Sequence, residues 1–486
     1  MTTGHEKKGQ FYVTTPIYYV NDKPHIGHAY TTIASDVLAR YYRSLGNEVI
    51  FLTGTDENSQ KTVDAALKSG EEIKSYADRL AGVWKSVWQV LNISNTDFIR
   101  TTEERHIKVV HEIWQRIWDN GDIYKGKYEG LYCGGHEAFM KESDLVSGLC
   151  PDHQTKPKHI TEENYFFKLS KYQDELIKFY DQNPEFMTPE VRFNEVKSFV
   201  RQGLEDISIS REKQEWGIPV PNDPSHAIYV WFDALINYVS AVGIDAWGNH
   251  PADIHAIGKD IIRFHGVIWP AMLMSAKIPL PKQLMTNGFF TVNGVKISKS
   301  LGNAINPVDL TQKYGVDALR YFLLREIPYG DDGDFSEEKL KERYNADLAN
   351  GLGNFAARVT ALGEALHELR KTEVEESVLQ AISDARKKFD KKIHEFKFHE
   401  TIAAIWKLIE FGDLYVNKHK PWEEKDSEKK NKVVYNLVVV LDNVASLVSS
   451  VMPETGAKIT NSISWTGENS LSVKRVAVLF SRTDRN

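Results

Sequence analysis

Cysteine is scarce in this chain, with only Cys133 and Cys150 among 486 residues. Two cysteines do not build the disulfide framework of a small secreted protein, and the polar stretch Met1–Gln10 lacks the apolar core of a signal peptide. The sequence therefore predicts a cytoplasmic protein, in which the two cysteines bind a metal or lie buried as thiols.

Long uninterrupted hydrophobic runs are also missing. The apolar stretch 433–451 is broken by Asn436, Asp442 and Asn443, which predicts a buried helix and not a membrane span. An excess of positive charge is absent too, because the net charge is −7. This excludes a protein that coats nucleic acid indiscriminately, but it allows a local RNA-binding surface.

What the chain does have is the composition of a globular enzyme, with 42% hydrophobic and 26% charged residues. Its length predicts two to four domains. The aromatic and β-branched stretch 11–15 predicts a strand, 29–45 a helix and 49–52 a second strand. A similar strand and helix recur at 254–257 and 261–276. Such βαβ units indicate an α/β fold with a Rossmann-type parallel sheet, whose ligands bind at the carboxyl ends of the strands.

Two histidines flank a glycine where the first strand gives way to its helix, in His25-Ile26-Gly27-His28. A helix N-terminus attracts anions through its amide groups and dipole, so both imidazoles can face a bound triphosphate. Gly27 removes a side chain that would keep an adenine ring from the backbone. The alternative is a surface turn with two solvated histidines.

A second candidate, Lys296–Ser300 with the sequence KISKS, follows a hairpin turn expected at Asn293-Gly294. Two lysines and two serines in a loop can close over phosphates, with Lys299 neutralising charge that develops on pyrophosphate. Alone, the segment is more typical of a solvated basic loop. Together with the first motif, at opposite ends of one α/β domain, it indicates nucleotide chemistry.

These two segments resemble the signature motifs of class I aminoacyl-tRNA synthetases. Three further blocks are similar to the methionine branch of that family, namely Thr15–Asn21 (TPIYYVN), Tyr229–Leu235 (YVWFDAL) and Gly258–His265 (GKDIIRFH). The resemblance runs from about Phe11 to the C-terminus. It implies that the chain activates L-methionine with ATP and transfers it to tRNA(Met).

The resemblance also implies a domain order. The Rossmann-fold catalytic domain would occupy 1–119 and 224–290, with an inserted connective domain at 120–223 that holds both cysteines. Residues 291–345 would form a stem-contact region with the lysine loop, and 346–486 an all-helical anticodon-binding bundle.

By the same resemblance, Asp56 would hold the substrate ammonium and aromatic walls would surround the thioether, with which sulfur makes favourable contacts. The implied methionine-binding residues are Ile17, Tyr19, Asp56, Trp231, Ala234, Leu235, Tyr238, Ile261, His265 and Trp269. Taken singly, each aromatic residue among them is better explained as ordinary core, and only its position within a family block favours the binding role.

For ATP, similarity assigns His25, Gly27, His28, Gly258, Asp260, Ile261 and Lys299 to binding, with Mg²⁺ on the phosphates. The implied catalytic residues are His25, His28, Lys296, Lys299 and Arg211. None acts as nucleophile or base, because the methionine carboxylate itself attacks the α-phosphorus. Arg211 is equally compatible with a surface arginine.

One local departure stands next to Asp56. Where the family usually continues Asp-Glu-His-Gly, this chain has Asp56-Glu57-Asn58-Ser59. The aspartate is retained while an adjacent imidazole and glycine are lost, which puts the geometry of this loop in question.

Cys133-Gly-Gly-His136 and Cys150-Pro-Asp-His153 have the spacing of a structural Cys₂His₂ zinc site. The family's zinc-bearing members generally use cysteine where His136 stands. The alternative is a knuckle that has lost its metal and is held by packing.

In the helical region, Asn354 and Arg358 are one turn apart, and Trp422 follows Pro421. By resemblance these three residues recognise the CAU anticodon, whose unpaired bases can be bonded and stacked. Without the family, Trp422 is better explained as a helix-cap hydrophobe. No β-barrel module follows the bundle, which favours a monomer.

Three rival hypotheses remain open from the sequence. Leucine, isoleucine, valine or cysteine could replace methionine as substrate, although the branched-chain enzymes carry longer insertions. A smaller nucleotidyltransferase uses a similar histidine motif but lacks the bundle. A non-catalytic tRNA-binding protein is disfavoured by the intact histidines and lysines. Amino-acid-dependent ATP–pyrophosphate exchange separates all three.

Overall fold

The chain folds into two units, each assembled from segments that are distant in the sequence. The computed structural model describes residues 9–133, 138–140, 142–151, 154–212, 216–292, 294–296, 304–467 and 469–483. The first unit contains Met1–Lys23, Gly46–Val87 and Asn95–Thr286. The second contains Pro24–Leu45, Trp88–Ser94 and Asn287–Asn486.

A six-stranded sheet forms the centre of the first unit, with strand order β3-β2-β1-β12-β13-β7. Its strands are β1 (Gln10–Tyr19), β2 (Glu48–Asp56), β3 (Asp97–Arg100), β7 (Met187–Thr188), β12 (Ile254–Gly258) and β13 (Gln283–Asn287). β1 pairs in parallel with both β2 and β12. The predicted Rossmann-type sheet is therefore confirmed, with β1 at the switch point where nucleotide sites form.

Helices of the first unit follow the expected amphipathic pattern. They include α2 (Gln60–Ser69), α3 (Ile73–Val90, of which the first unit contains the part up to Val87), α4 (Glu104–Asp119), α7 (Val230–Leu235), α8 (Asn237–Ser240), α9 (Ile244–Asn249) and α10 (Trp269–Ala276). In α4 the buried residues Val110, Ile113, Trp114 and Ile117 recur at helical spacing and join the hydrophobic core.

The helix expected at 261–276 is interrupted. A 3₁₀ turn covers Lys259–Ile261, and a π-helical turn covers Phe264–Ile268 before α10 begins. The amide of Trp269 donates to the carbonyl of Phe264, five residues earlier. Such π turns widen a helix locally and occur often at functional sites.

The segment 120–223 builds mostly antiparallel structure. One sheet has the order β5-β4-β6-β8, from Ala138–Met140, Ile123–Cys133, Lys158–Phe167 and Ile207–Ser208. Helices α5 (Gln173–Gln182) and α6 (Glu190–Arg201) separate β6 from β8, and β9 (Ser210–Glu212), β10 (Pro219–Val220) and β11 (Asp223–Ile228) form a second sheet. However, β7 pairs in parallel with β13, so part of the predicted insertion belongs to the main sheet.

The second unit begins with α1 (Ile26–Ser44) and continues after β13. Its other elements are β14 (Phe290–Val292), β15 (Val295–Lys296), β16 (Gly333–Phe335), α11 (Pro307–Tyr314), α12 (Val316–Glu326), α13 (Glu337–Arg343), a π-helical stretch at Tyr344–Gly353 and α14 (Asn354–Glu364). Val292 pairs with Val295 across β14 and β15, and Gly294 has φ +76°, which confirms the predicted hairpin.

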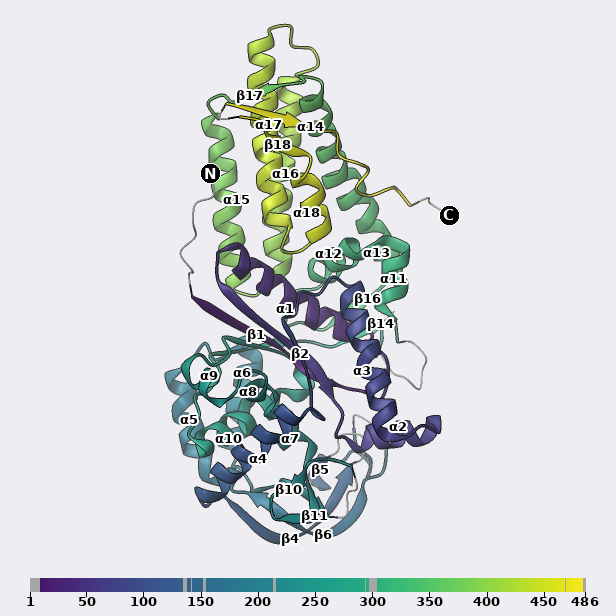
Figure 1. The fold of residues 1–486 in the computed structure, drawn as a ribbon, viewed down its shortest axis with the longest axis vertical. Helices are drawn as coiled ribbons and strands as arrows, with labels where there is room; N and C mark the ends of the chain where they lie inside the picture. The colour runs from purple at the N-terminus through teal and green to yellow at the C-terminus, as the bar shows by residue number, and fades with distance from the viewer. Residues whose placement is uncertain are drawn as a thin grey trace. The chain divides into compact units, whose positions relative to one another are not determined.

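Three long helices of the second unit lie side by side (Figure 1). They are α15 (Glu376–His394), α16 (Phe398–His419) and α17 (Ser427–Val448), followed by α18 (Pro453–Thr460). Strands β17 (Leu369–Arg370), β18 (Ile463–Trp465) and β19 (Ser470–Val473) form a small sheet. The expectation of a purely helical C-terminal domain is therefore wrong, because the chain after α18 pairs with the segment after α14.

Among the described residues, α17 is the one helix long and apolar enough to cross a membrane by length and composition, which is weak evidence alone. Within its apolar window, 67% is buried. The helix packs against α14, α15, α16 and α18. This packing agrees with the interpretation of 433–451 as a buried helix.

A buried ion pair joins α1 to α12. Arg320 donates to Asp36 Oδ2 at 2.6 Å, and both side chains are fully buried. The Arg320 guanidinium also donates to the carbonyls of Ser450 and Val451, just before α18. Burial opposes ionisation of Asp36, but the charges of Arg320 and Arg40 outweigh it and lower the pKa of this carboxyl. One arginine thus ties three distant segments together.

Candidate active site

The carboxyl ends of β1 and β2 place two of the predicted methionine-binding residues side by side. Tyr19 and Asp56, the last residues of these strands, are direct partners in the parallel ladder. The register shifts between Thr14 and Ile17, around Pro16, which has no amide hydrogen to contribute to the ladder. Gly54 is required here, because a Cβ would lie 2.1 Å from the Ile99 carbonyl and 3.0 Å from Ile17.

Aromatic rings gather around Tyr19. Trp231, from α7, approaches it edge-on with ring centroids 6.3 Å apart, and Phe264 stacks on Trp231 at 3.8 Å. The Lys61 ammonium lies 4.3 Å from the centre of the Tyr19 ring. The indole N–H of Trp231 is buried and has no hydrogen-bond partner among the described residues. That donor is available to a ligand.

A buried histidine fixes the interior of this group. His265 Nδ1 contacts the Ile261 carbonyl at 3.0 Å, and its Nε2 contacts the Tyr238 hydroxyl at 2.7 Å. Because a carbonyl only accepts, Nδ1 carries the proton and Nε2 accepts from Tyr238. Burial lowers the pKa of His265 to about 4, so the ring is neutral at pH 7.

A second buried histidine, His255 on β12, also forms hydrogen bonds through both ring nitrogens. Its Nε2 accepts from the indole N–H of Trp269 at 3.3 Å, so Nδ1 donates to the Thr14 hydroxyl at 2.7 Å. Burial, with a contribution from His265, holds the pKa of His255 well below its ordinary value. Both imidazoles act here as uncharged hydrogen-bonding groups.

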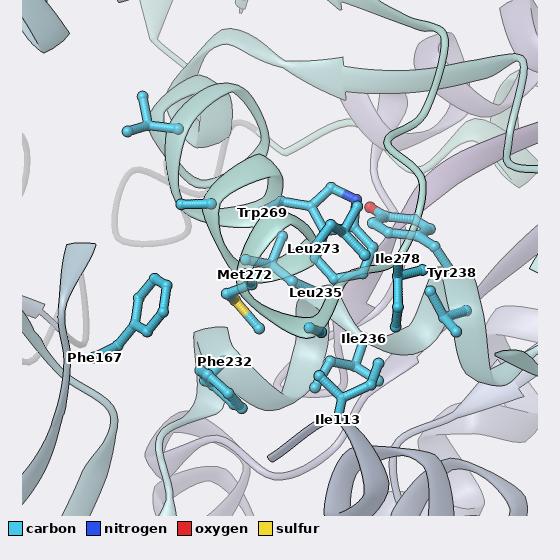
Figure 2. Packing of buried hydrophobic residues seen from close by; sticks show 14 of the residues in the cluster. Ile113, Phe167, Phe232, Leu235, Ile236, Tyr238, Trp269, Met272, Leu273 and Ile278 are labelled. Atoms are coloured by element: carbon cyan, nitrogen blue, oxygen red, sulfur yellow. The ribbon is translucent and has the colours of Figure 1, made fainter. Parts of the chain in front are cut away.

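All ten predicted methionine-binding residues belong to the first unit. Ile17, Tyr19, Trp231 and Ile261 are partly exposed, whereas the remaining six are buried. Leu235, Tyr238 and Trp269 lie in the large hydrophobic cluster drawn in Figure 2. The group therefore has a packed interior and a partly exposed rim that carries Tyr19 and Trp231.

The predicted adenosine-binding residues follow β12 directly. Gly258 ends that strand, and Asp260 is exposed in the turn after it. A Cβ at Gly258 would lie 2.5 Å from Asp260 Oδ1, so only glycine allows the carboxylate to occupy this position.

The predicted catalytic residue Arg211 lies on β9. It is paired with Glu162 at 3.0 Å, and its guanidinium lies 4.3 Å from the centre of the Tyr132 ring.

In the second unit, His25 and His28 cap helix α1. The Gly27 amide donates to His25 Nδ1 at 3.1 Å, and the His25 amide donates to His28 Nδ1 at 3.2 Å. The two rings stack at 3.7 Å. Since both Nδ1 atoms accept, the proton of each ring lies on Nε2. A Cβ at Gly27 would press on the His25 ring at 3.0 Å, a second reason for glycine there.

The lysine loop is only partly described. Lys296 ends β15, opposite Thr291, and Lys299 lies outside the described residues.

The predicted anticodon residues are all described. Asn354 is exposed at the start of α14, while the Arg358 guanidinium lies 4.9 Å from the ring centre of Trp422, whose surface is 47% exposed. Arg358 and Trp422 thus form one surface group.

Two of the four predicted zinc ligands are described. Cys133 and Cys150 are both buried and no disulfide joins them. His136 and His153 lie outside the described residues. Within the described part of the chain, no group of three or more metal-binding side chains occurs.

Several residues of this region were not predicted from the sequence. Phe264 stands inside the block Gly258–His265, and its stacking on Trp231 has no signal in the sequence apart from that block. A second set is polar: Asn58 Nδ2 donates to Asp233 Oδ2 at 2.7 Å, and His106 Nε2 lies 2.6 Å from Asp233 Oδ1. For this polar set, the only signal in the sequence was that Asn58 departs from the family pattern. The sequence did not indicate its partner Asp233.

Comparison with known proteins gives one consistent result. The family model described as tRNA synthetases class I (M) matches residues 11–160 and 153–360. A methionine–tRNA ligase of Thermotoga maritima is 44% identical over 94% of this chain and 75% of its own length. One from Streptomyces coelicolor is 44% identical over 95% and 91%.

Solved structures agree with the sequence relatives. Methionyl-tRNA synthetase of Mycobacterium tuberculosis bound by methionyl-adenylate has a TM-score of 0.92 and 38% identity, covering 97% of this chain and all of that one. The apo form of that enzyme has a TM-score of 0.84 at 35% identity, over 99% of this chain.

Proposed function

The chain belongs to the class I tRNA synthetases of the methionine group, and on this basis we propose that the edge formed by Tyr19, Asp56 and Trp231 binds methionine for activation. The reaction converts L-methionine and ATP into methionyl-adenylate and pyrophosphate, and then transfers methionine to tRNA(Met). The observation that carries the proposal is the pairing of Tyr19 with Asp56 beside Trp231.

For the amino acid, the Asp56 carboxylate receives the ammonium group through a charge-assisted hydrogen bond. The rings of Tyr19, Trp231 and Phe264 supply apolar and polarisable contacts for the thioether. The neutral His265–Tyr238 pair keeps charge away from the side chain. A substrate with a charged or strongly polar side chain would leave its polar groups unsatisfied there.

For ATP, the Nε2–H groups of His25 and His28 donate to phosphate oxygens, together with Lys296 and Lys299. Gly258, Asp260 and Ile261 hold the adenosine, and Arg211 assists near the reacting groups. A methionine carboxylate oxygen bonds to the α-phosphorus, and the bond to the bridging oxygen of pyrophosphate breaks. That oxygen takes the electron pair. Mg²⁺ bound to the phosphates supplies further neutralisation of their charge.

For tRNA, Asn354, Arg358 and Trp422 bind the CAU anticodon. Support comes from the exposed indole of Trp422 with the Arg358 guanidinium against it, a combination that stacks on and bonds to unpaired bases. We further propose that the protein acts in the cytoplasm as a monomer.

Zinc is the remaining group to assign. The two buried cysteines have the donor chemistry that zinc prefers, and His136 and His153 follow each by three residues. Four protein ligands would leave no open position on zinc, so its role would be structural, in the segment between β4 and β6. Elemental analysis of purified protein should find about one zinc per chain, lost after replacement of both cysteines by serine. A metal-free, fully folded protein would contradict this.

The activity itself is tested by ATP–pyrophosphate exchange with single amino acids. Exchange should require methionine and should not occur with leucine, isoleucine, valine or cysteine. Lys299→Ala should lower the exchange rate while tRNA affinity stays nearly unchanged, because Lys299 acts on pyrophosphate. Exchange at the parent rate in Lys299→Ala would remove the role given to this residue.

A further inference from the structure

Asn58 stands where the family usually has histidine, and its surroundings give it a definite task. The loop Asp56–Ser59 is buried throughout, with Asn58 only 5% exposed. The Asn58 amide nitrogen of the backbone donates to Asp56 Oδ1 at 3.3 Å. Its side-chain nitrogen donates to Asp233 Oδ2 at 2.7 Å and to the Thr101 carbonyl at 3.3 Å. Asn58 therefore connects the end of β2 with helix α7.

Asp233 is held from both sides. Its Oδ2 accepts from Asn58, and its Oδ1 accepts from His106 Nε2 at 2.6 Å. His106 Nδ1 in turn contacts the Ser240 hydroxyl at 2.7 Å, at the end of α8. Asp233, His106 and Ser240 are all buried. A carboxylate in such a place needs partners on both oxygens, so loss of one leaves a costly unsatisfied acceptor.

Both elements joined by this bond contribute residues to the proposed methionine site. One carries Asp56, and the other carries Trp231 and Ala234 within the same short helix as Asp233. Helix α7 has only six residues and no side-chain cap, and it packs through Phe232 and Leu235 into the core. The hydrogen bonds of Asp233 add the polar contacts that orient this helix toward the end of β2. A small shift of α7 would change the separation of Trp231 from Asp56.

We propose that Asn58 is a positioning residue for methionine, which sets the carboxylate of Asp56 and the indole of Trp231 at a fixed separation through its bond to Asp233. The inference rests on the proposed roles of Asp56 and Trp231. Asparagine can do this in place of histidine, because its side-chain nitrogen occupies nearly the same distance from the backbone as an imidazole Nδ1–H. The departure from the family pattern thus keeps a donor facing Asp233.

Substitutions at position 58 test the assignment through the Michaelis constants of ATP–pyrophosphate exchange. Asn58→Asp is nearly isosteric but turns the donor into an acceptor that faces Asp233. We expect it to raise the methionine KM about tenfold or more, from the usual effect of an unsatisfied buried group, and to leave the ATP KM within about twofold. Asn58→His, which keeps a donor, should stay within about threefold of the parent for methionine.

Two parallel variants make the result decisive. Ser59→Ala removes the neighbouring cap of α2, where Ser59 accepts from the Thr62 amide. It should lower the melting temperature and leave both KM values unchanged. Asp56→Asn tests the amine site itself. If Asn58→Asp does not fold, Asn58→Ala replaces it, since it removes the bond to Asp233 without adding charge.

The outcomes separate cleanly. A raised methionine KM in Asn58→Asp with recovery in Asn58→His supports the positioning role. Unchanged methionine KM in Asn58→Asp, or equal increases for methionine and ATP, overturns the role of Asn58 while a raised methionine KM in Asp56→Asn keeps the proposed site. If Asp56→Asn also binds methionine normally, the site assignment and the inference fail together.

Discussion

At the scale of single residues, His265 gives a prediction about pH. In the unfolded chain a histidine titrates near 6.5, whereas burial lowers the pKa of His265 to about 4. Between these values the unfolded state binds a proton that the folded state excludes, so stability falls as the pH is lowered. From pH 7 to 5 this histidine should cost about 2 kcal/mol of unfolding free energy.

His265→Gln should remove the loss of unfolding free energy that His265 causes between pH 7 and 5. Glutamine can still accept from Tyr238 and donate to Ile261, but it does not titrate. Urea unfolding of parent and variant at pH 7 and 5 measures it. His159, whose side chain is 59% exposed, provides the control, since His159→Gln should keep the full pH dependence. An acid loss in His265→Gln equal to that of the parent would show that His265 is accessible to protons when folded.

Some single residues of the candidate site could be predicted from the sequence, and others could not. Tyr19 and Asp56 were predicted because each ends a strand pattern within a family block, and parallel pairing then makes them neighbours. The link from Asn58 to Asp233 was beyond reach, because it spans 175 positions and depends on how α7 packs. Side-chain hydrogen bonds between distant segments leave no periodicity in a sequence.

At the scale of elements, the Asp36–Arg320 pair between α1 and α12 supports a stability prediction. Arg320→Met should lower the unfolding free energy by about 3–5 kcal/mol, because it leaves a buried carboxylate without its main partner. The double variant Asp36→Leu with Arg320→Met should recover much of this loss, since it removes the buried charge as well. Chemical unfolding of the three proteins gives the comparison. If Arg320→Met were at least as stable as the double variant, the unpaired Asp36 would not carry the expected free-energy cost.

Elements were predicted well where they follow the hydrophobic pattern. Strands β1, β2 and β12 and helices α1 and α17 lie where periodicity and apolar runs indicated them. The π-helical turn at Phe264–Ile268 and the edge strand β7 were missed. Both depend on tertiary contacts, since a single π turn within a helix is too short to change the hydrophobic pattern and a two-residue strand has no pattern of its own.

At the scale of the whole molecule, the proposed assignment separates activation from tRNA recognition. Trp422→Ala should lower kcat/KM for tRNA charging roughly 10- to 100-fold, the value of one lost base stack. ATP–pyrophosphate exchange should stay within about twofold, because it does not use the anticodon. Trp118, 44% exposed on α4, offers a matched tryptophan, and Trp118→Ala should change neither activity. Equal charging by Trp422→Ala and parent would remove Trp422 from the anticodon site.

The interleaving of the two units has a consequence for biosynthesis. Helix α1, which opens with His25 and His28, belongs to a unit whose other segments are mostly translated much later. Arg320, which donates to Asp36, is translated 284 residues after it. Ser450 and Val451, whose carbonyls accept from Arg320, are translated later still. A nascent chain stopped after β13 therefore carries an N-terminal histidine motif whose helix still lacks Arg320, the buried partner of Asp36. Protection of α1 from proteolysis should accordingly appear only once the final helices have left the ribosome.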